Sequence, residues 1–126
     1  ITLPKDLIKK IISGEKLYEM RKCRPTNVKI GEDGFFVVEK GTNEVRCWCR
    51  IDDFYTTYIN YYGACKWASR LSVPVDYVIK YAMGENVCMW KIGKVIEFEC
   101  LCRESLMVDR NPQQFAYCPL SYGESY

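Results

Sequence analysis

Hydrophobic side chains recur at helical spacing at the start of the chain and then alternate with polar ones. Apolar residues separated mainly by lysines predict an amphipathic helix over about residues 4–13: Leu3, Leu7, Ile8, Ile11 and Ile12. Gly14 fits the end of that helix, because a left-handed backbone costs little only for glycine. The alternation that follows predicts a strand over about residues 16–22, with Glu19 and Arg21 on one face.

The rest of the pattern predicts strands on both sides of a helical centre. Strand periodicity or short apolar runs bounded by turns occur in further segments, at 28–30, 34–39, 44–51, 87–92, 94–102 and 115–118. The tyrosine-rich segment 53–62 fits a short helix or an extended lobe, and 65–71 fits a helical turn or short helix. Ser72 is expected to cap a further helix that ends at Gly84.

This order of elements suits a small, mainly antiparallel β-barrel whose openings are covered by helices, an α+β fold. The predicted core consists of apolar residues and thiols from these segments: Leu7, Ile11, Phe36, Val38, Cys47, Cys49, Val78, Ile92, Val95, Ile96 and Phe115.

Length and composition limit the class of protein. A chain of 126 residues with 48% hydrophobic and 14% aromatic residues is large enough to bury a core, and we expect one domain over 1–126. No apolar run approaches the ~20 residues that a membrane span needs, and no signal peptide is visible, so no membrane partner is expected. These features favour a cytoplasmic protein.

Cysteine is frequent and histidine is absent, with 8 cysteines in the chain. Cys47 and Cys49 alternate on one predicted strand, and Cys100 and Cys102 on another. Two such strands can in principle supply four thiolates, but the spacing lies outside the usual zinc patterns. Buried free cysteine more often behaves as a small apolar residue. We therefore expect reduced core thiols, no metal and no cofactor.

Charge is unevenly distributed although the net charge is only +2, which is too small to indicate nucleic-acid binding by itself. Seven cations fall within residues 9–29, around the predicted strand: Lys9, Lys10, Lys16, Arg21, Lys22, Arg24 and Lys29. The same range, residues 9–29, contains only two acidic residues, Glu15 and Glu19. We interpret the lysines of the first helix as a solvated face and the rest as a local basic field.

The predicted strand after Gly14 carries side chains that suit recognition of a nucleotide. Lys16 offers a mobile charge for a phosphate, and Arg21 offers a planar fork for a phosphate or a base edge. Glu19 can accept a hydrogen bond from an exocyclic amine. Tyr18, or an aromatic of the central segment such as Tyr61, Tyr62 or Trp67, can stack on a base. The alternative is structural: an ion pair between Glu19 and Arg21 closes the barrel, and Lys16 is a solvated corner.

Two stretches resemble the ASCH domain, a member of the PUA-like β-barrel superfamily. Ile12-Ser13-Gly14-Glu15-Lys16 followed by Tyr18-Glu19-x-Arg21-Lys22 is similar to the family signature. Residues Trp90 to Phe98, followed by Asn111-Pro112-Gln113-Gln114-Phe115-Ala116-Tyr117, resemble the closing strands and the Pro-Gln-x-Phe segment of that family. The resemblance implies a PUA-like barrel with a ligand cleft at its mouth, where Gln113 is expected to donate or accept a hydrogen bond.

The resemblance also implies what the cleft binds. We expect a module for RNA or a modified nucleotide, with Lys16, Tyr18, Glu19, Arg21, Lys22 and Gln113 as ligand-binding residues. An enzymatic branch of the family hydrolyses the acetyl amide of N4-acetylcytidine and shares Lys16. Its proposed nucleophile is a threonine at the position of Glu19, and its acidic residue aligns approximately with Ser69, so this chain departs at two positions.

Two other functions remain as alternatives. The first is a hydrolase acting on nucleic acid, either a ribonuclease or an amidohydrolase of the N4-acetylcytidine type, with Lys16 and Glu19 as catalytic groups. The second is an adaptor that binds a protein partner through the aromatic lobe from Phe54 to Trp67.

Overall fold

The structure of the protein is a computed structural model, which describes the backbone of residues 1–102 and the side chains through Glu99. The elements follow in the order β1 (Thr2–Leu3), α1 (Lys5–Ser13), β2 (Tyr18–Arg21), β3 (Gly34–Glu39), β4 (Glu44–Tyr58), α2 (Tyr61–Leu71), α3 (Val75–Ala82) and β5 (Asn86–Cys102). None of the helices in these 102 residues is long and apolar enough to cross a bilayer.

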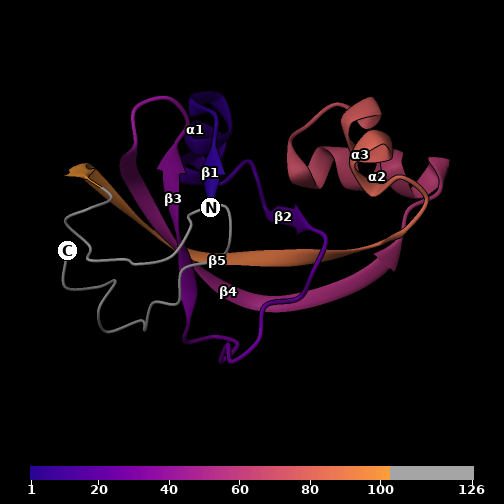
Figure 1. The fold of residues 1–126 in the computed structure, drawn as a ribbon, viewed down its shortest axis with the longest axis horizontal. Helices are drawn as coiled ribbons and strands as arrows, with labels where there is room; N and C mark the ends of the chain where they lie inside the picture. The colour runs from indigo at the N-terminus through magenta and orange to yellow at the C-terminus, as the bar shows by residue number, and fades with distance from the viewer. Residues whose placement is uncertain (103–126) are drawn as a thin grey trace.

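The strands form one sheet in the order β1-β3-β4-β5-β2. Only β1 and β3 pair in parallel, and the other three pairs are antiparallel. The long strands β4 and β5 curve together, so the sheet curls into a half-barrel (Figure 1). The architecture is α+β and mainly antiparallel with flanking helices, as the sequence predicts.

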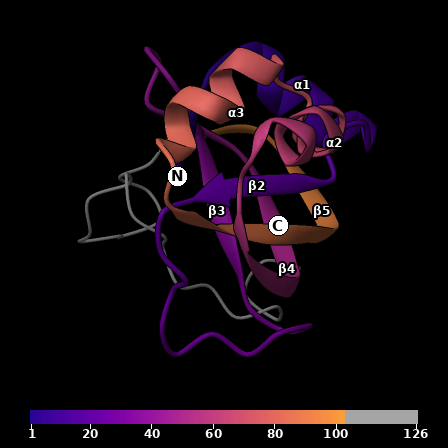
Figure 2. The ribbon, with the colours of Figure 1, turned by 90° about the vertical axis from the view of Figure 1, so that its right-hand side faces the viewer.

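The three helices lie on the same side of the curled sheet, as the end-on view in Figure 2 shows. Helix α1 lies near β1 and β3, whereas α2 and α3 are inserted between β4 and β5 and lie over the far end of these strands (Figure 1). Strand β2 runs between the two groups of helices. Strand β2 therefore has α1 on one side and α2 and α3 on the other (Figure 1).

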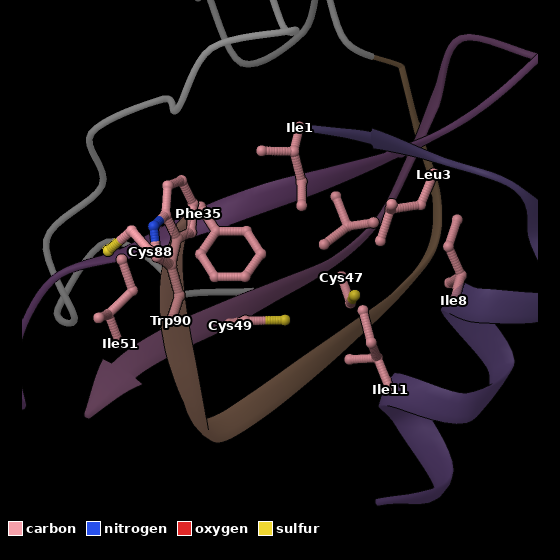
Figure 3. Packing of buried hydrophobic residues seen from close by; sticks show 11 residues of the cluster. Ile1, Leu3, Ile8, Ile11, Phe35, Cys47, Cys49, Ile51, Cys88 and Trp90 are labelled. Atoms are coloured by element: carbon pink, nitrogen blue, oxygen red, sulfur yellow. The ribbon is translucent and has the colours of Figure 1, made fainter. Parts of the chain in front are cut away.

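Two apolar clusters attach the helices to the sheet. The first joins α1 to β3, β4 and β5, and its members include Ile8, Ile11, Phe35 and Trp90 (Figure 3). Cys47 and Cys49 lie in this cluster and are fully buried, as predicted for core thiols. The second cluster joins α2 and α3 to β2 and β5: Met20, Ile59, Ala64, Trp67, Ala68, Leu71, Val78, Ala82, Val87 and Met89. A third cluster, with Trp48 at its centre, lies on β3, β4 and β5.

Several predicted elements have different bounds in the structure. Segment 28–30 forms no strand, and the segments 87–92 and 94–102 are one continuous strand, β5. The tyrosine-rich segment 53–62 is extended through Tyr58, where β4 pairs with β5, and its last two residues, Tyr61 and Tyr62, begin α2. The predicted strand 115–118, with Phe115, lies outside the described residues.

Helix ends also differ from expectation at two positions. Helix α3 ends at Ala82, with Met83 rather than Gly84 as its left-handed C-cap. Gly14 ends α1 in the left-handed conformation, with φ 84°, as predicted. Ser72, however, does not cap the start of α3. It ends α2 with φ 56°, and Pro74 occupies the N-cap position of α3. Of the predicted core, Leu7, Ile92, Val95 and Ile96 are only partly buried.

Candidate functional site

A cavity of about 540 Å³ lies where β2 meets the helices. The lining residues come from β1 and α1, from β2, from the connection between α2 and α3, and from α3. Among the predicted ligand-binding residues, Lys16, Glu19 and Arg21 line this cavity, and Tyr18 and Lys22 are not among its lining residues. The structure therefore brings three of the predicted residues together, and Gln113 lies outside the described residues.

Lys16 is buried rather than a solvated corner, with 3% of its surface exposed. Its Nζ donates a hydrogen bond of 2.9 Å to the carbonyl oxygen of Leu71, at the end of α2, and lies 3.3 Å from Oε1 of Glu19. Burial lowers the pKa of Lys16 below its usual value, while the Glu19 carboxylate acts in the opposite direction. Lys16 thus links β2 to the end of a helix 55 residues away in the sequence.

Glu19 lies between two cations, Lys16 before β2 and Arg21 on the same face of β2. Its second oxygen, Oε2, is 2.8 Å from a terminal nitrogen of Arg21, and the carboxylate is almost fully buried. Because both oxygens are paired, Glu19 holds the Arg21 side chain in one position. This ion pair is the one that the alternation of the sequence predicts.

Arg21 retains hydrogen-bonding capacity that its protein neighbours do not use. The guanidinium is about one quarter exposed, at 23%, and lines the cavity. Its Nε is buried, and no hydrogen-bond partner for that atom exists among the described residues. Buried donors without partners are rare in proteins and cost free energy unless a water or a ligand accepts from them. Arg21 is therefore the side chain of β2 best placed to meet a ligand.

Tyr18 and Lys22 contact the helices instead. The Tyr18 ring packs edge-on against Trp67, with ring centroids 4.9 Å apart, because Tyr18 lies on the opposite face of β2 from Glu19. The Lys22 ammonium donates to the carbonyl oxygen of Tyr81 and lies 4.8 Å from the centre of the Tyr81 ring. Both side chains thus fasten α2 and α3 to the strand.

Four further lining residues were not among the predicted site residues. They are Lys10 of α1, Lys40 directly after β3, and Tyr77 and Tyr81 of α3. No local sequence signal connects these residues, because they lie on three elements that meet only in the folded chain. The helical periodicity of α1 predicted that Lys10 lies on a solvated face. In the structure its Nζ donates a hydrogen bond of 3.4 Å to the carbonyl oxygen of Ser72.

The predicted aromatic lobe is divided by the fold. Trp67 is buried in the second cluster, and Phe54 packs against the first. Tyr55, Tyr58, Tyr61 and Tyr62 are the exposed members. No cluster of three or more metal-ligating side chains occurs within the part of the chain that the structure describes.

Solved structures with the same arrangement exist. The crystal structure of ASCH from Zymomonas mobilis matches with a TM-score of 0.74 at 15% identity, over 92% of this chain and 82% of that one. The chain has the ASCH fold. A serine-to-alanine mutant of the Zymomonas protein matches with a TM-score of 0.71 at 16% identity, over 99% of this chain and 89% of that one. A tyrosine-to-phenylalanine mutant of the same protein matches with a TM-score of 0.67 at 15% identity, over 99% of this chain and 91% of that one.

At this level of identity the similarity is one of fold. No protein-family model and no curated protein matches the chain by sequence. The resemblance that the Gly14–Lys22 segment carries is thus confirmed by the ASCH fold. In that fold the segment leaves α1, turns at Gly14, and places Lys16, Glu19 and Arg21 at the cavity.

Proposed function

We propose that this ASCH-fold protein binds RNA or a modified nucleotide in the cavity beside β2, and that Arg21 is the main contact. The observation that carries the proposal is the guanidinium itself, which Glu19 holds in position and which is 23% exposed and lines the cavity. Arginine in a fixed orientation suits phosphate oxygens and base edges, which accept two parallel hydrogen bonds. Lys16 and Glu19 serve this contact by holding Arg21.

Binding is favoured over hydrolysis because the two proposed catalytic groups are already engaged. Lys16 donates to a backbone carbonyl and to Glu19, and Glu19 has a cation at each oxygen. Both side chains are also buried, with 3% of Lys16 and 5% of Glu19 exposed, which leaves them little surface to act on a substrate. The hydrolase alternative is tested by incubating the protein with labelled RNA and with N4-acetylcytidine. If the wild type turns over either substrate and Glu19→Gln does not, hydrolysis becomes the favoured function.

The test of the binding function is the affinity of purified variants for a labelled single-stranded RNA, measured by fluorescence anisotropy at fixed salt. Arg21→Ala is expected to weaken binding about tenfold or more, because a hydrogen bond to a charged group contributes about 1.5–3 kcal/mol. Arg21→Lys should restore only part of the loss, since lysine lacks the planar fork. For the wild type, affinity should fall modestly as salt rises.

The matched control is Arg46→Ala. Arg46 is also partly buried and ion-paired, to Glu39 and Glu44, but it lies on β4 and does not line the cavity. Its removal should leave RNA affinity unchanged. Equal affinities for wild type and Arg21→Ala, with both proteins folded, would refute the proposed site.

A further inference from the structure

The cavity has two chemically different walls. One wall is cationic and consists of Lys10, Arg21 and Lys40. The other is apolar and aromatic and comes from α3 and the two residues before it: Val73, Pro74, Tyr77 and Tyr81. A ligand that fills the space would therefore meet both cations and aromatic or apolar side chains.

The aromatic wall contains a ring that is held in place and a ring that is open. Tyr77 and Tyr81 are one helical turn apart on α3 and stack, with ring centroids 6.2 Å apart and planes inclined by 22°. Tyr81 is fixed from β2 by Lys22, which contacts its ring and its carbonyl oxygen. Tyr77 remains 51% exposed, so a third ring can extend the stack.

The cationic wall has more positive charge than its acidic neighbours balance. Four lining residues are cations, Lys10, Lys16, Arg21 and Lys40, and Glu19 is the one acidic residue among the lining residues. Glu19 is already paired at both oxygens by Lys16 and Arg21. Lys40 is exposed and forms no ion pair with any residue whose side chain is described. The wall is therefore suited to an anion that carries more than one acceptor oxygen.

We propose that the cavity binds one phosphorylated nucleoside, with its base on Tyr77 and its phosphate on the cationic wall of Lys10, Arg21 and Lys40. This proposal rests on the proposed function and names the unit that the site recognises. A cavity of about 540 Å³ lies within the range of about 300–1,000 Å³ that is usual for small-ligand sites, so a single nucleotide unit fits it. A free nucleoside lacks the anion that the cationic wall requires.

The two walls predict separable effects on binding. The test is isothermal titration calorimetry with the four ribonucleoside monophosphates and their four unphosphorylated nucleosides. The wild type should bind at least one monophosphate about tenfold or more tightly than its nucleoside. Lys40→Ala should weaken the monophosphate several-fold and leave the nucleoside unchanged. Tyr77→Ala should weaken both by a similar factor, and Tyr77→Phe should restore both, because stacking needs the ring and not the hydroxyl.

Two matched controls address non-specific effects. Tyr62→Ala removes a tyrosine that is 83% exposed on α2 and outside the cavity lining, and it should leave all affinities unchanged. Lys9→Ala removes an exposed lysine next to Lys10 in sequence that also lies outside the lining, with the same expectation.

The outcomes separate this proposal from the function on which it rests. If the wild type binds RNA through Arg21 but binds monophosphates and nucleosides equally, the two-wall assignment is wrong and the binding function stands. Unchanged affinities in Tyr77→Ala also refute the assignment. If the wild type binds neither RNA nor any nucleotide, both proposals are wrong.

Discussion

At the scale of single residues, the cation that matters most for the architecture is Lys16. It is the residue that the sequence places at the corner between helix and strand, and the structure buries it. Its ammonium has a backbone carbonyl and a carboxylate as partners, so the charge is compensated inside the protein. Removing one partner of such a pair is costly, because the other charge stays buried.

We expect the Glu19 carboxylate to limit the fall of the Lys16 pKa that burial causes. Burial lowers the pKa of Lys16 and Glu19 raises it, so Glu19→Gln should move this pKa further down. The measurement is an NMR titration of the Lys16 side chain in both proteins. Glu44→Gln, which removes a half-exposed glutamate paired with Arg46, is the control and should leave the Lys16 pKa unchanged. A Lys16 pKa that stays the same or rises in Glu19→Gln would contradict the assigned coupling.

Strand periodicity was enough to predict that Glu19 and Arg21 share a face, because that relation depends only on neighbouring residues. Strand periodicity could not predict the partners of Lys16 and Lys22. Both lysines donate to backbone carbonyls more than 50 residues away, and a carbonyl has no sequence identity that a pattern can reveal.

At the scale of elements, the pairing of β3 with β4 depends on the absence of a side chain at Gly34. A Cβ at this position would lie 2.0 Å from the carbonyl oxygen of Cys49 and 2.7 Å from Cζ2 of Trp48. The first of these atoms belongs to the backbone of the neighbouring strand, and the second to a fully buried ring. Neither can move without disturbing the sheet.

Gly34→Ala should therefore lower the free energy of unfolding by about 3 kcal/mol, at the upper end of the usual cost of overpacking. Gly93→Ala is the matched control. There the nearest atoms belong to the Asp52 carboxylate, at 2.2–2.4 Å, and a side-chain end can rotate away at smaller cost. Urea unfolding of the two variants should show the larger loss for Gly34→Ala. Similar losses in both would contradict this account of the strand contact.

The predicted elements were most accurate where a single periodicity covers the whole segment. Helix α1 and strand β3 have the expected bounds within a residue or two. Strand β4 was predicted to end early, since three register shifts interrupt its pairing with β5 and therefore its alternation. The prediction for Ser72 was wrong because a serine between two helices can end the first helix or cap the start of the second. The backbone angles of Ser72 show that it ends α2.

At the scale of the whole molecule, α2 and α3 form a lobe that is attached to the sheet through β2. The attachment is partly apolar, through the second cluster, and partly polar, through Lys16 at the end of α2 and Lys22 at the end of α3. Since α3 carries Tyr77 and Tyr81, the position of the lobe fixes the aromatic wall of the cavity.

Lys22→Met should loosen that lobe without unfolding the sheet, because it keeps the aliphatic stem and removes the ammonium. Hydrogen exchange measured by mass spectrometry should become faster in α3 and remain unchanged in β3 and β4. Lys80→Met, at an exposed position on α3 itself, is the control and should leave exchange as in the wild type. Identical exchange in α3 for the wild type and Lys22→Met would show that the apolar cluster alone holds the lobe.

The two lysines have one more consequence for the cavity. The carboxyl end of a helix is the negative pole of its dipole, and such a pole repels anions. The carbonyls of Leu71 and Tyr81 belong to the negative poles of α2 and α3, and both residues line the cavity. Because Lys16 and Lys22 donate to these carbonyls, each pole is neutralised where it meets the site. The phosphate of the proposed ligand would therefore meet less repulsion from the ends of these two helices.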